Sequence, residues 1–286
     1  MLHDLGDGLI LRRAAVSDTD ELAAFNAFIH GETPGQPDLR VGAWVRDLMD
    51  GHPTFKPDDF TVVIDTRAGK IVSSMNLISQ TWVYEGISFE VGQPELVGTH
   101  PDYRRGGLVR AQFEEIHRWS AQRGQMVQAI TGIPYYYRQF GYEMALELSG
   151  GRAGYDPNIP QLKPGEGEPY RIRQAVEADI PFLDRLYRLS WKRQPLNIVR
   201  DEAMWRYEIS GKNPQNTNCE QIRLIETPGG EPVGFLIHPP YRWESMLAAI
   251  YYEVKPGLSW AAVTPSVIRY LKAAGGALPP EYGEDP

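Results

Sequence analysis

The chain has 286 residues, which is long for one domain and sufficient for two of roughly 100–200 residues each. Hydrophobic residues make up 42% of the sequence and charged residues 23%, a composition typical of soluble globular proteins rather than disordered or fibrous ones. The net charge of −8 has the wrong sign for a general nucleic-acid binder, and the single cysteine, Cys219, excludes an internal disulfide and a cysteine-rich metal site.

The sequence also gives no sign of a membrane segment or an export signal. The most apolar stretch, residues 247–263, is interrupted by Glu253, Lys255 and Pro256, so it is too broken to span a bilayer. The first ten residues lack a basic region followed by an apolar one. We therefore expect a cytoplasmic protein with neither a membrane nor a nucleic acid as partner. The six histidines have no metal-ligand spacing, and we expect no metal.

Hydrophobic periodicity in the first 150 residues predicts alternating strands and helices. A strand over 9–12 precedes a helix that starts after Ser17, and a second helix covers 39–49. The pattern then predicts strands at 60–65, at 71–79 and up to 96–99, a helix from the 101–107 loop to about 122, a short buried strand at 126–130, a helical turn at 135–140 and a closing strand at 142–148. This order predicts an α/β (α+β) fold, with a mixed, mostly antiparallel sheet flanked by helices.

The second half of the chain repeats the pattern of the first at a constant offset of 161 residues. The offset pairs Arg12 with Arg173 and Asp18 with Asp179, and it also aligns the strand-turn-strand at 64–72 with 225–233. Such agreement indicates a fold duplicated in tandem, although chance agreement among common residues is the alternative. We expect a first domain over 1–150, a Gly- and Pro-rich linker over 151–168 and a second domain over 169–286.

The second copy differs from the first where a glycine-rich loop would be expected. At the offset position it has residues 258–267, Leu-Ser-Trp-Ala-Ala-Val-Thr-Pro-Ser-Val, which contain neither glycine nor an arginine pair. The chain also ends before strands equivalent to the last ones of the first half. We therefore expect a degenerate second domain, either incomplete at its C-terminus or finished by residues beyond Pro286.

The strand-loop-helix segment at 96–110 gives the clearest indication of a functional site. Gly98 lies within a strand pattern, where glycine commonly marks a bulge or a close backbone approach. Gly106 and Gly107 open the following helix beside Arg104 and Arg105, so free backbone amides and positive charge would meet at one spot. A helix start of this kind binds phosphate. The alternative is an ordinary glycine-rich helix start with solvated arginines.

The longer segment Val97–Arg110 resembles the coenzyme A pyrophosphate signature of the GNAT N-acetyltransferase superfamily, with Arg104-x-x-Gly107 in the matching positions. Val109 departs from the usual small residue, and this looks more like the enhanced-intracellular-survival acetyltransferases, which carry tandem GNAT domains. The segment Tyr137–Tyr142 is similar to the superfamily's second block, Tyr-x-x-x-Gly-Phe. The resemblance covers residues 8–149.

The resemblance implies transfer of an acetyl group from the co-substrate acetyl-CoA to the primary amine of a small molecule or peptide, by direct attack in a ternary complex. Tyr137 is then the candidate general acid for the leaving thiolate, although it could instead pack with its two neighbouring tyrosines. The backbone amides around Val97, Gly98 and Thr99 would hold the thioester carbonyl and its oxyanion. The pyrophosphate would bind at Arg104, Arg105, Gly106, Gly107, Leu108, Val109 and Arg110.

The sequence says less about the general base and the acceptor. Glu95 and His100 flank the strand end and are both candidates for the base, and water is the third if the amine binds neutral. The acidic balance favours a cationic acceptor such as a polyamine, with Glu32, Asp38 and Asp47 as sources of the local field. Two alternatives to an enzyme remain: a coenzyme A-binding sensor or structural module without turnover, and a pure interaction protein. The second domain would shape the acceptor cleft or an interface in a homo-oligomer.

Overall fold

The computed structural model describes residues 3–33, 35–133, 135–146 and 150–281 and divides the chain into two compact units. The first unit contains Met1–Leu146 together with two short segments from later in the chain, Pro195–Val199 and Lys212–Asn218. The second contains Glu147–Gln194, Arg200–Gly211 and Cys219–Pro286. A single boundary near residue 150 therefore does not separate the units, because two segments of the second half pack with the first.

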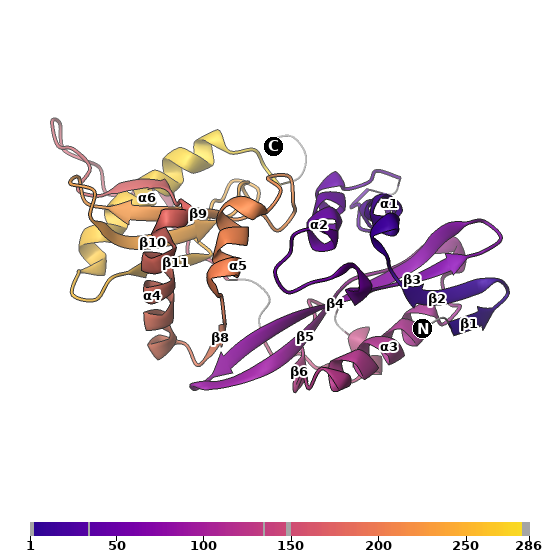
Figure 1. The fold of residues 1–286 in the computed structure, drawn as a ribbon. Helices are drawn as coiled ribbons and strands as arrows, with labels where there is room; N and C mark the ends of the chain where they lie inside the picture. The colour runs from indigo at the N-terminus through magenta and orange to yellow at the C-terminus, as the bar shows by residue number, and fades with distance from the viewer. Residues whose placement is uncertain (1–2, 34, 134, 147–149, 282–286) are drawn as a thin grey trace. The chain divides into compact units, whose positions relative to one another are not determined.

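The first unit is built on one sheet with the strand order β1-β2-β3-β4-β5-β6, and β8 pairs with β4 off this path (Figure 1). Every pair in it is antiparallel except β5–β6, which is parallel, so the predicted mixed and mostly antiparallel sheet is confirmed. The strands are β1 (His3–Gly6), β2 (Leu9–Arg13), β3 (Phe60–Asp65), β4 (Lys70–Tyr84), β5 (Ile87–Thr99), β6 (Val127–Gln128) and β8 (Leu196–Ile198).

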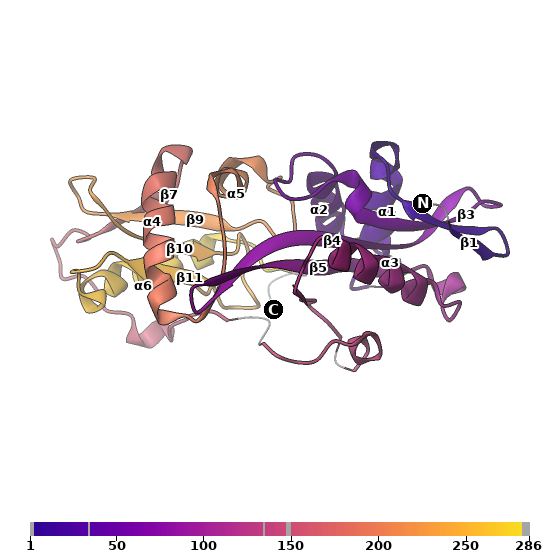
Figure 2. The ribbon, with the colours of Figure 1, turned by 60° about the horizontal axis from the view of Figure 1, so that its bottom comes forward.

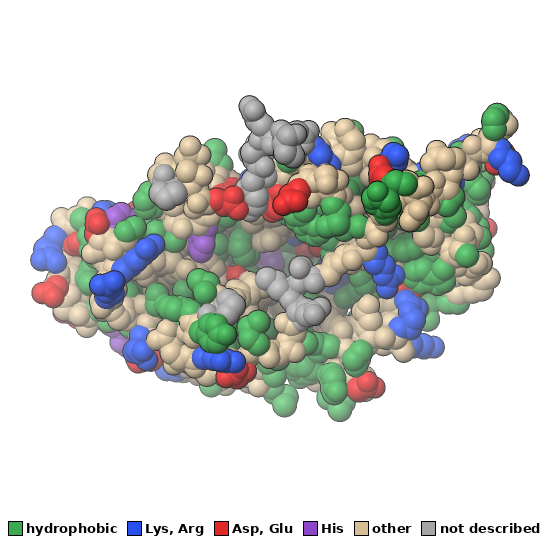
Figure 3. All heavy atoms as spheres, turned by 180° about the vertical axis from the view of Figure 1, so that it is seen from behind, with side chains coloured by type: hydrophobic (Ala, Val, Ile, Leu, Met, Phe, Trp, Pro, Cys, Tyr) green, Lys and Arg blue, Asp and Glu red, His purple; other side chains and the backbone are tan. Residues whose placement is uncertain are grey.

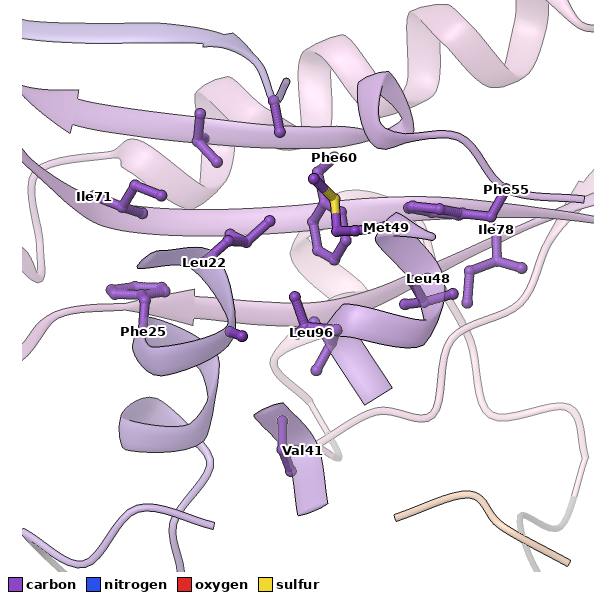
Figure 4. Close-up of a cluster of buried hydrophobic side chains, with 14 residues drawn as sticks. Leu22, Phe25, Val41, Leu48, Met49, Phe55, Phe60, Ile71, Ile78 and Leu96 are labelled. Atoms are coloured by element: carbon purple, nitrogen blue, oxygen red, sulfur yellow. The ribbon is translucent and has the colours of Figure 1, made fainter. Parts of the chain in front are cut away.

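Helices cover both faces of this sheet (Figures 1 and 2). α1 (Thr19–Ile29) and α2 (Leu39–Met49) lie on one face, over a buried cluster that includes Leu22, Leu48 and Phe60 (Figure 4). α3 (Leu108–Gln122) lies on the other face, where its apolar stripe packs on Met75 and Leu77 of β4. Because side chains alternate along a strand, Ser74, Asn76 and Ile78 of β4 face α1 and α2.

Most of the predicted elements of the first half are found. α2 and β3 have the predicted bounds, and α3 ends at the predicted residue. The strand predicted at 71–79 is longer and reaches Tyr84, because apolar alternation fades toward an exposed hairpin tip. β1 was not predicted, since four residues of mixed polarity carry no clear period.

Two predictions near the end of the first half are wrong. The strand expected at 126–130 shrinks to Val127–Gln128 and is not buried, since Met126 is 78% and Val127 44% exposed. Residues 142–146 form no strand, while 147 and 148 lie outside the described residues. Side-chain contacts hold this segment instead of a ladder: Tyr142 packs against Phe113 and hydrogen-bonds to Gln128.

The second unit has a four-stranded antiparallel sheet with the order β11-β10-β9-β7. The helix α4 has its first residue 161 positions after that of α1 (180 and 19), and its last residue at the same offset (190 and 29). The strand β9 is displaced from β3 by the same 161 residues (221 and 60, 226 and 65). The elements are β7 (Arg171–Gln174), α4 (Ile180–Ser190), α5 (Glu202–Arg206), β9 (Gln221–Glu226), β10 (Pro232–His238), β11 (Tyr251–Val254) and α6 (Trp260–Ala277).

The segment predicted as a linker packs against the second unit. Arg269 of α6 donates hydrogen bonds of 2.6 and 2.7 Å to the carboxylate of Glu168 and one of 2.7 Å to the carbonyl of Pro160. Ile159 is buried. Residues 150–168 lack periodicity, but anchored contacts of this kind do not need it. Within the part of the chain that the structure describes, no helix is both long and apolar enough to cross a membrane.

Candidate active site

A pocket of about 880 Å³ lies within the first unit, where the end of β5 and the following segments separate. The strand β6 pairs with β5 at Val91 and Gly92, and the chain beyond it then runs along the far wall of the pocket. Three groups of residues line the pocket: Ile29, His30, Val41 and Trp44 from α1 and α2; Glu95–Thr99, Tyr103–Arg105 and Gly107–Arg110; and Ile130, Thr131, Ile133, Tyr136, Tyr137, Gln139 and Phe140.

The strand β5 carries a bulge at the pocket. Ser74 of β4 pairs with Gly98 and Asn76 pairs with Glu95, so Met75 alone opposes both Leu96 and Val97. Leu96 has a φ of +54°, in the left-handed region, and a bulge leaves its extra residue out of the ladder. The predicted bulge therefore exists, but it lies before Gly98 rather than at it.

Gly98 itself agrees with the second of the two expectations, a close approach of another segment. A Cβ atom there would lie 2.7 Å from Cγ2 of Ile29, so glycine allows α1 to approach the strand closely. The end of the same strand is tied to α3 by buried polar groups. Ser73 donates to Oε1 of Gln112 at 2.6 Å and lies 2.8 Å from the hydroxyl of Thr99. This network was missed, although a glutamine on the apolar face of α3 was a signal for it.

The start of α3 presents free backbone amides to the pocket. Gly107 is the N-cap with a φ of +76°, and its carbonyl accepts the first helical bond from Ala111 at 3.0 Å. The amides before that bond have no partner within the helix. The first turn of α3 contains no acidic residue, and the arginines of the loop and first turn line the pocket beside it. An anion is favoured at such a helix end.

The structure brings together the residues that the sequence assigned to the co-substrate. Val97, Gly98, Thr99, Arg104, Arg105, Gly107, Leu108, Val109 and Arg110 all line the pocket, whereas Gly106 does not. Val109, the atypical residue of the signature, packs against the apolar cluster beneath α3. Its larger side chain is thus partly accommodated in the core.

Tyr137 also lines the pocket, in a short 3₁₀ turn, Tyr137–Phe140, that agrees with the predicted helical turn. Its ring packs edge-on against Phe113 of α3, with centroids 6.0 Å apart. Burial raises the pKa of Tyr137 to about 12, and the negative charge of Glu95 and the neighbouring Tyr136 add to this. The phenol is therefore protonated at neutral pH and can donate a hydrogen bond or a proton.

Glu95 is the only carboxylate among the described residues that line the pocket. Its Oε1 accepts hydrogen bonds from Thr131 at 2.7 Å and from Gln93 at 2.8 Å. Gln93 in turn accepts a hydrogen bond from Gln80 at 2.6 Å, so a chain of hydrogen-bonded side chains positions the carboxylate. Burial raises the pKa of Glu95, although its neutral donors oppose that rise. A half-buried carboxylate with a raised pKa suits a general base.

The other residues considered for the base and the acceptor field do not reach the pocket. His100 accepts a hydrogen bond from the Asp102 amide at 3.4 Å and stacks on Phe28. Asp38 caps α2 and pairs with Arg40. Asp47 accepts hydrogen bonds from Asn213 and Asn216, while Glu32 is exposed away from the pocket. The structure therefore leaves Glu95 as the candidate base that the pocket contains. The described residues contain no group of three or more His, Cys, Asp or Glu side chains that could hold a metal ion.

Comparison with known proteins agrees with this geometry. Residues 11–145 match the family model of the acetyltransferase (GNAT) domain. None of the curated proteins matches the chain.

Three solved structures are similar to the chain over nearly its whole length. A conserved protein of unknown function from Enterococcus faecalis V583, titled a probable N-acyltransferase, is 11% identical with a TM-score of 0.62, over 98% of this chain and 64% of that protein. Saccharomyces cerevisiae N-myristoyltransferase with bound myristoyl-CoA is 14% identical with a TM-score of 0.63, over 96% and 70%. A GCN5-related N-acetyltransferase from Kribbella flavida is 16% identical with a TM-score of 0.60, over 94% and 61%.

The fold is thus that of the GNAT acyltransferases, with a curled and mostly antiparallel sheet between helices. The pocket lies within the unit that contains residues 11–145, the part of the chain that matches the acetyltransferase (GNAT) domain model. The chain spans about two thirds of the Enterococcus protein and less of the Kribbella protein.

Proposed function

We propose that this chain transfers an acetyl group from acetyl-CoA to a primary amine, by direct attack in a ternary complex. The observation that supports this most is the pocket that joins a glycine-arginine helix start to the bulged strand, Tyr137 and Glu95. An anion site, backbone amides at the thioester carbonyl and an acid–base pair are the parts that acyl transfer from a thioester to an amine requires.

Binding of the co-substrate falls to the segment between β5 and α3. The amides of Gly107–Arg110 and the side chains of Arg104 and Arg105 suit the pyrophosphate. The amides around Val97, Gly98 and Thr99, beside the bulge, suit the thioester carbonyl. They would stabilise the oxyanion that forms when the amine attacks.

Glu95 and Tyr137 divide the proton transfers between them. Glu95 takes a proton from the ammonium, and the free amine attacks the carbonyl carbon to form a C–N bond. The C–S bond then breaks, and Tyr137 gives its phenolic proton to the departing thiolate. The phenolate that results takes the second proton of the attacking nitrogen, so that a neutral amide and the free thiol are the products. Because the charge of Glu95 raises the pKa of Tyr137, protonation of Glu95 makes Tyr137 a stronger acid when the thiolate leaves. The first transfer therefore prepares the second.

The choice of acetyl rather than another acyl group is part of this proposal. The family model describes acetyltransferases, whereas one structural neighbour holds myristoyl-CoA. The second unit belongs to the proposal as well: we infer that it arose by tandem duplication and lost the ligand loop, as in the enhanced-intracellular-survival group. The shared offset of α1 with α4 and of β3 with β9 supports this history.

One observation favours a second candidate, a coenzyme A-binding module without turnover. With a pKa of about 12, Tyr137 is a much weaker acid than a thiol of about 8.5, so complete proton transfer is uphill. In that case the protein would bind coenzyme A, but departure of the thiolate would be too slow for turnover.

Two measurements separate the two functions. Thiol release from acetyl-CoA is followed with a panel of primary amines, and calorimetry measures coenzyme A binding by the same protein. Release that depends on an amine supports the transferase. Binding without release supports the module, and the absence of binding rejects both.

A further inference from the structure

We propose that the side of the pocket formed by α1 and α2 is the acceptor site, and that it takes a primary amine attached to an apolar group, such as an arylalkyl or branched alkyl amine, rather than a polycation. This inference rests on the proposed function, because it assigns the second substrate of the same site.

The pocket is lined from both faces of the sheet, and the two faces differ in character. The phosphate-binding features all belong to α3 and the loop before it. Ile29 and His30 come from the end of α1, and Val41 and Trp44 come from α2, on the opposite face. An acceptor that meets the thioester without displacing coenzyme A therefore has the α1–α2 wall available to it.

Strand register places the candidate base on that same side. Glu95 pairs with Asn76, and side chains of paired residues share a face. Asn76 alternates with Ser74, which hydrogen-bonds to Asn26 of α1, and with Ile78, which packs in the α1–α2 cluster. The carboxylate that accepts the amine proton thus belongs to the acceptor face.

The α1–α2 wall is apolar. Val41 and Leu96 are 8% and 4% exposed and belong to the core cluster drawn in Figure 4, against which Ile29 and Trp44 also pack. The wall is therefore an edge of the hydrophobic core that reaches the pocket. Apolar surface of this kind gains free energy when it covers the apolar part of a ligand.

The wall lacks the charges that a polycation needs. Of its residues only His30 is titratable, and burial lowers its pKa, so the imidazole is neutral at neutral pH. Its Nε2 is buried and has no hydrogen-bond partner among the described residues. A second or third ammonium group of a polyamine would be desolvated here with no carboxylate besides Glu95 to receive it.

The face drawn in Figure 3 does not replace those charges. On the face drawn in Figure 3, acidic and basic side chains are interspersed, and no broad acidic field is visible. The net charge of −8 is thus not concentrated there. Long-range attraction of cations remains, but it does not select among amines at the reacting centre.

The test compares amines of the two classes at one pH, as thiol release with saturating acetyl-CoA. The probes are phenylethylamine and isopentylamine against spermidine and lysine. We expect kcat/KM for the apolar amines to exceed that for the cationic ones by at least tenfold, the low end of what one well-fitted apolar group contributes, about 10–200-fold.

A matched pair of variants locates the preference in the pocket. Ile133 lines the pocket and is 68% exposed, while Ile87 is 69% exposed at the β4–β5 hairpin and does not line it. Both substitutions to glutamate are compatible with folding because both side chains are exposed. Ile133→Glu should lower the apolar-to-cationic ratio about tenfold through its new charge, and Ile87→Glu should leave it unchanged.

A second pair probes the wall itself. For phenylethylamine as acceptor, Trp44→Ala should raise KM more than it lowers kcat, and Trp44→Phe should restore much of the loss. Calorimetry with coenzyme A on the same variants shows whether the part of the pocket proposed to bind coenzyme A is unchanged.

The outcomes separate this inference from the function on which it rests. Preference for the apolar amines that Ile133→Glu reduces supports the acceptor site. Release that is faster with spermidine or lysine overturns the inference and leaves acetyl transfer to amines standing. Binding of coenzyme A without release for any of the four amines overturns both.

Discussion

The turns that lead into α1 and α4 are alike, whereas the connections into α3 and α6 are not. Arg12 donates to Asp18 at 2.7 and 2.8 Å, and Arg173 donates to Asp179 at 2.7 and 2.9 Å. Each aspartate also accepts a backbone N–H three residues earlier, at 2.7 Å from Ala15 and 2.9 Å from Val176. These half-buried ion pairs fix the same strand-to-helix turn in both units.

The connections into α3 and α6 differ in length, in conformation and in the strand before them. The β5–α3 loop, residues 100–107, follows a bulged strand, whereas the β11–α6 loop is residues 255–259 and β11 pairs with β10 without a register shift. Gly107 is the N-cap of α3, whereas Ser259 caps α6. The comparison teaches that the same ion pairs and apolar patterns can build similar turns in both units, while the loop proposed to bind the co-substrate is found in only one of them.

The largest effect is expected from a negative charge in the β5–α3 loop, which we propose binds acetyl-CoA. Gly107→Glu places a carboxylate at the α3 start and should weaken acetyl-CoA binding by about 1000-fold, because like charges in contact cost several kcal/mol. Gly257→Glu in the β11–α6 loop is the matched control, since both glycines have φ between +76° and +88° and no atom within 4 Å of a new Cβ. Calorimetry with acetyl-CoA distinguishes the two, and equal affinities in both variants would remove the functional difference between the loops.

Replacement of the candidate base tests the acceptor face of the first unit. Glu95→Gln should lower kcat/KM by about 100-fold or more, as expected for the loss of a general base. The wild-type rate should fall as the pH drops through the raised pKa of Glu95, and the variant should lack this fall. Glu253→Gln is the control, because the pKa of Glu253 is raised by burial as well, but Glu253 belongs to β11 and pairs with Arg193. A variant as active as wild type would leave water as the base.

The same substitution makes a prediction about stability. The folded-state pKa of Glu95 is raised, so the folded protein binds more protons than the unfolded chain between the two pKa values, and stability falls as the pH rises through them. Glu95→Gln removes this loss, and its amide oxygen still accepts from Thr131 and Gln93. The variant should unfold at a higher Tm than wild type at pH 7, with the difference vanishing below about pH 4.5, the usual glutamate value. A lower Tm at pH 7 would contradict a buried charge.

The smaller catalytic effect belongs to the phenol. Tyr137→Phe should lower kcat by about 100-fold with little change in acetyl-CoA affinity, since only the proton donor is lost. Tyr251→Phe is a fair control, because burial raises the pKa of Tyr251 to about 12 as well, yet it lies in the second unit. The rate of acetyl transfer in a single turnover should be lower in Tyr137→Phe than in Tyr251→Phe. Equal rates in the two variants would mean that Tyr137 has a packing role and no part in proton transfer.

Much of this fold could be predicted because its elements have strong periods. The α2 and β3 patterns fixed both their bounds, and the 161-residue offset anticipated α4 and β9. The prediction of a strand at 142–148 was wrong because alternating aromatic and polar residues do not require a ladder. The contacts of one side chain, Tyr142, hold the segment instead. Burial depends on tertiary neighbours, and a single sequence does not show them.

The site could be predicted in part for the same reason. Two of its motifs, Arg104–Arg110 and Tyr137–Tyr142, are each a run of consecutive residues. Each motif can therefore be recognised in the sequence without knowledge of the fold. Glu95 could not be separated from His100, since register and burial decide which of them faces the pocket. The acceptor wall could not be foreseen either, because Ile29, Val41 and Trp44 meet only when two helices pack.

The smallest effect is expected where the later part of the chain supports the first unit. Asp47 of α2 accepts hydrogen bonds from the Asn213 amide at 2.9 Å and from the Asn216 side chain at 2.6 Å, while Thr217 donates to the Arg40 carbonyl. Asp47→Ala leaves the buried Asn216 amide without its acceptor, which costs about 1–3 kcal/mol of folding stability.

This loss should also reach the acceptor wall, because Val41 and Trp44 are on the same helix. We expect the KM for the amine to rise roughly three- to tenfold in Asp47→Ala, with the KM for acetyl-CoA unchanged, since small misplacements of a positioning wall weaken binding of the substrate it orients. Asp20→Ala is the control: Asp20 also pairs with α2, through Arg46, but its side chain is 94% exposed, so the pair contributes little. If both variants change the KM for the amine equally, or neither does, the segment Lys212–Asn218 has no part in positioning α2, and the second half contributes to the pocket by some other contact or not at all.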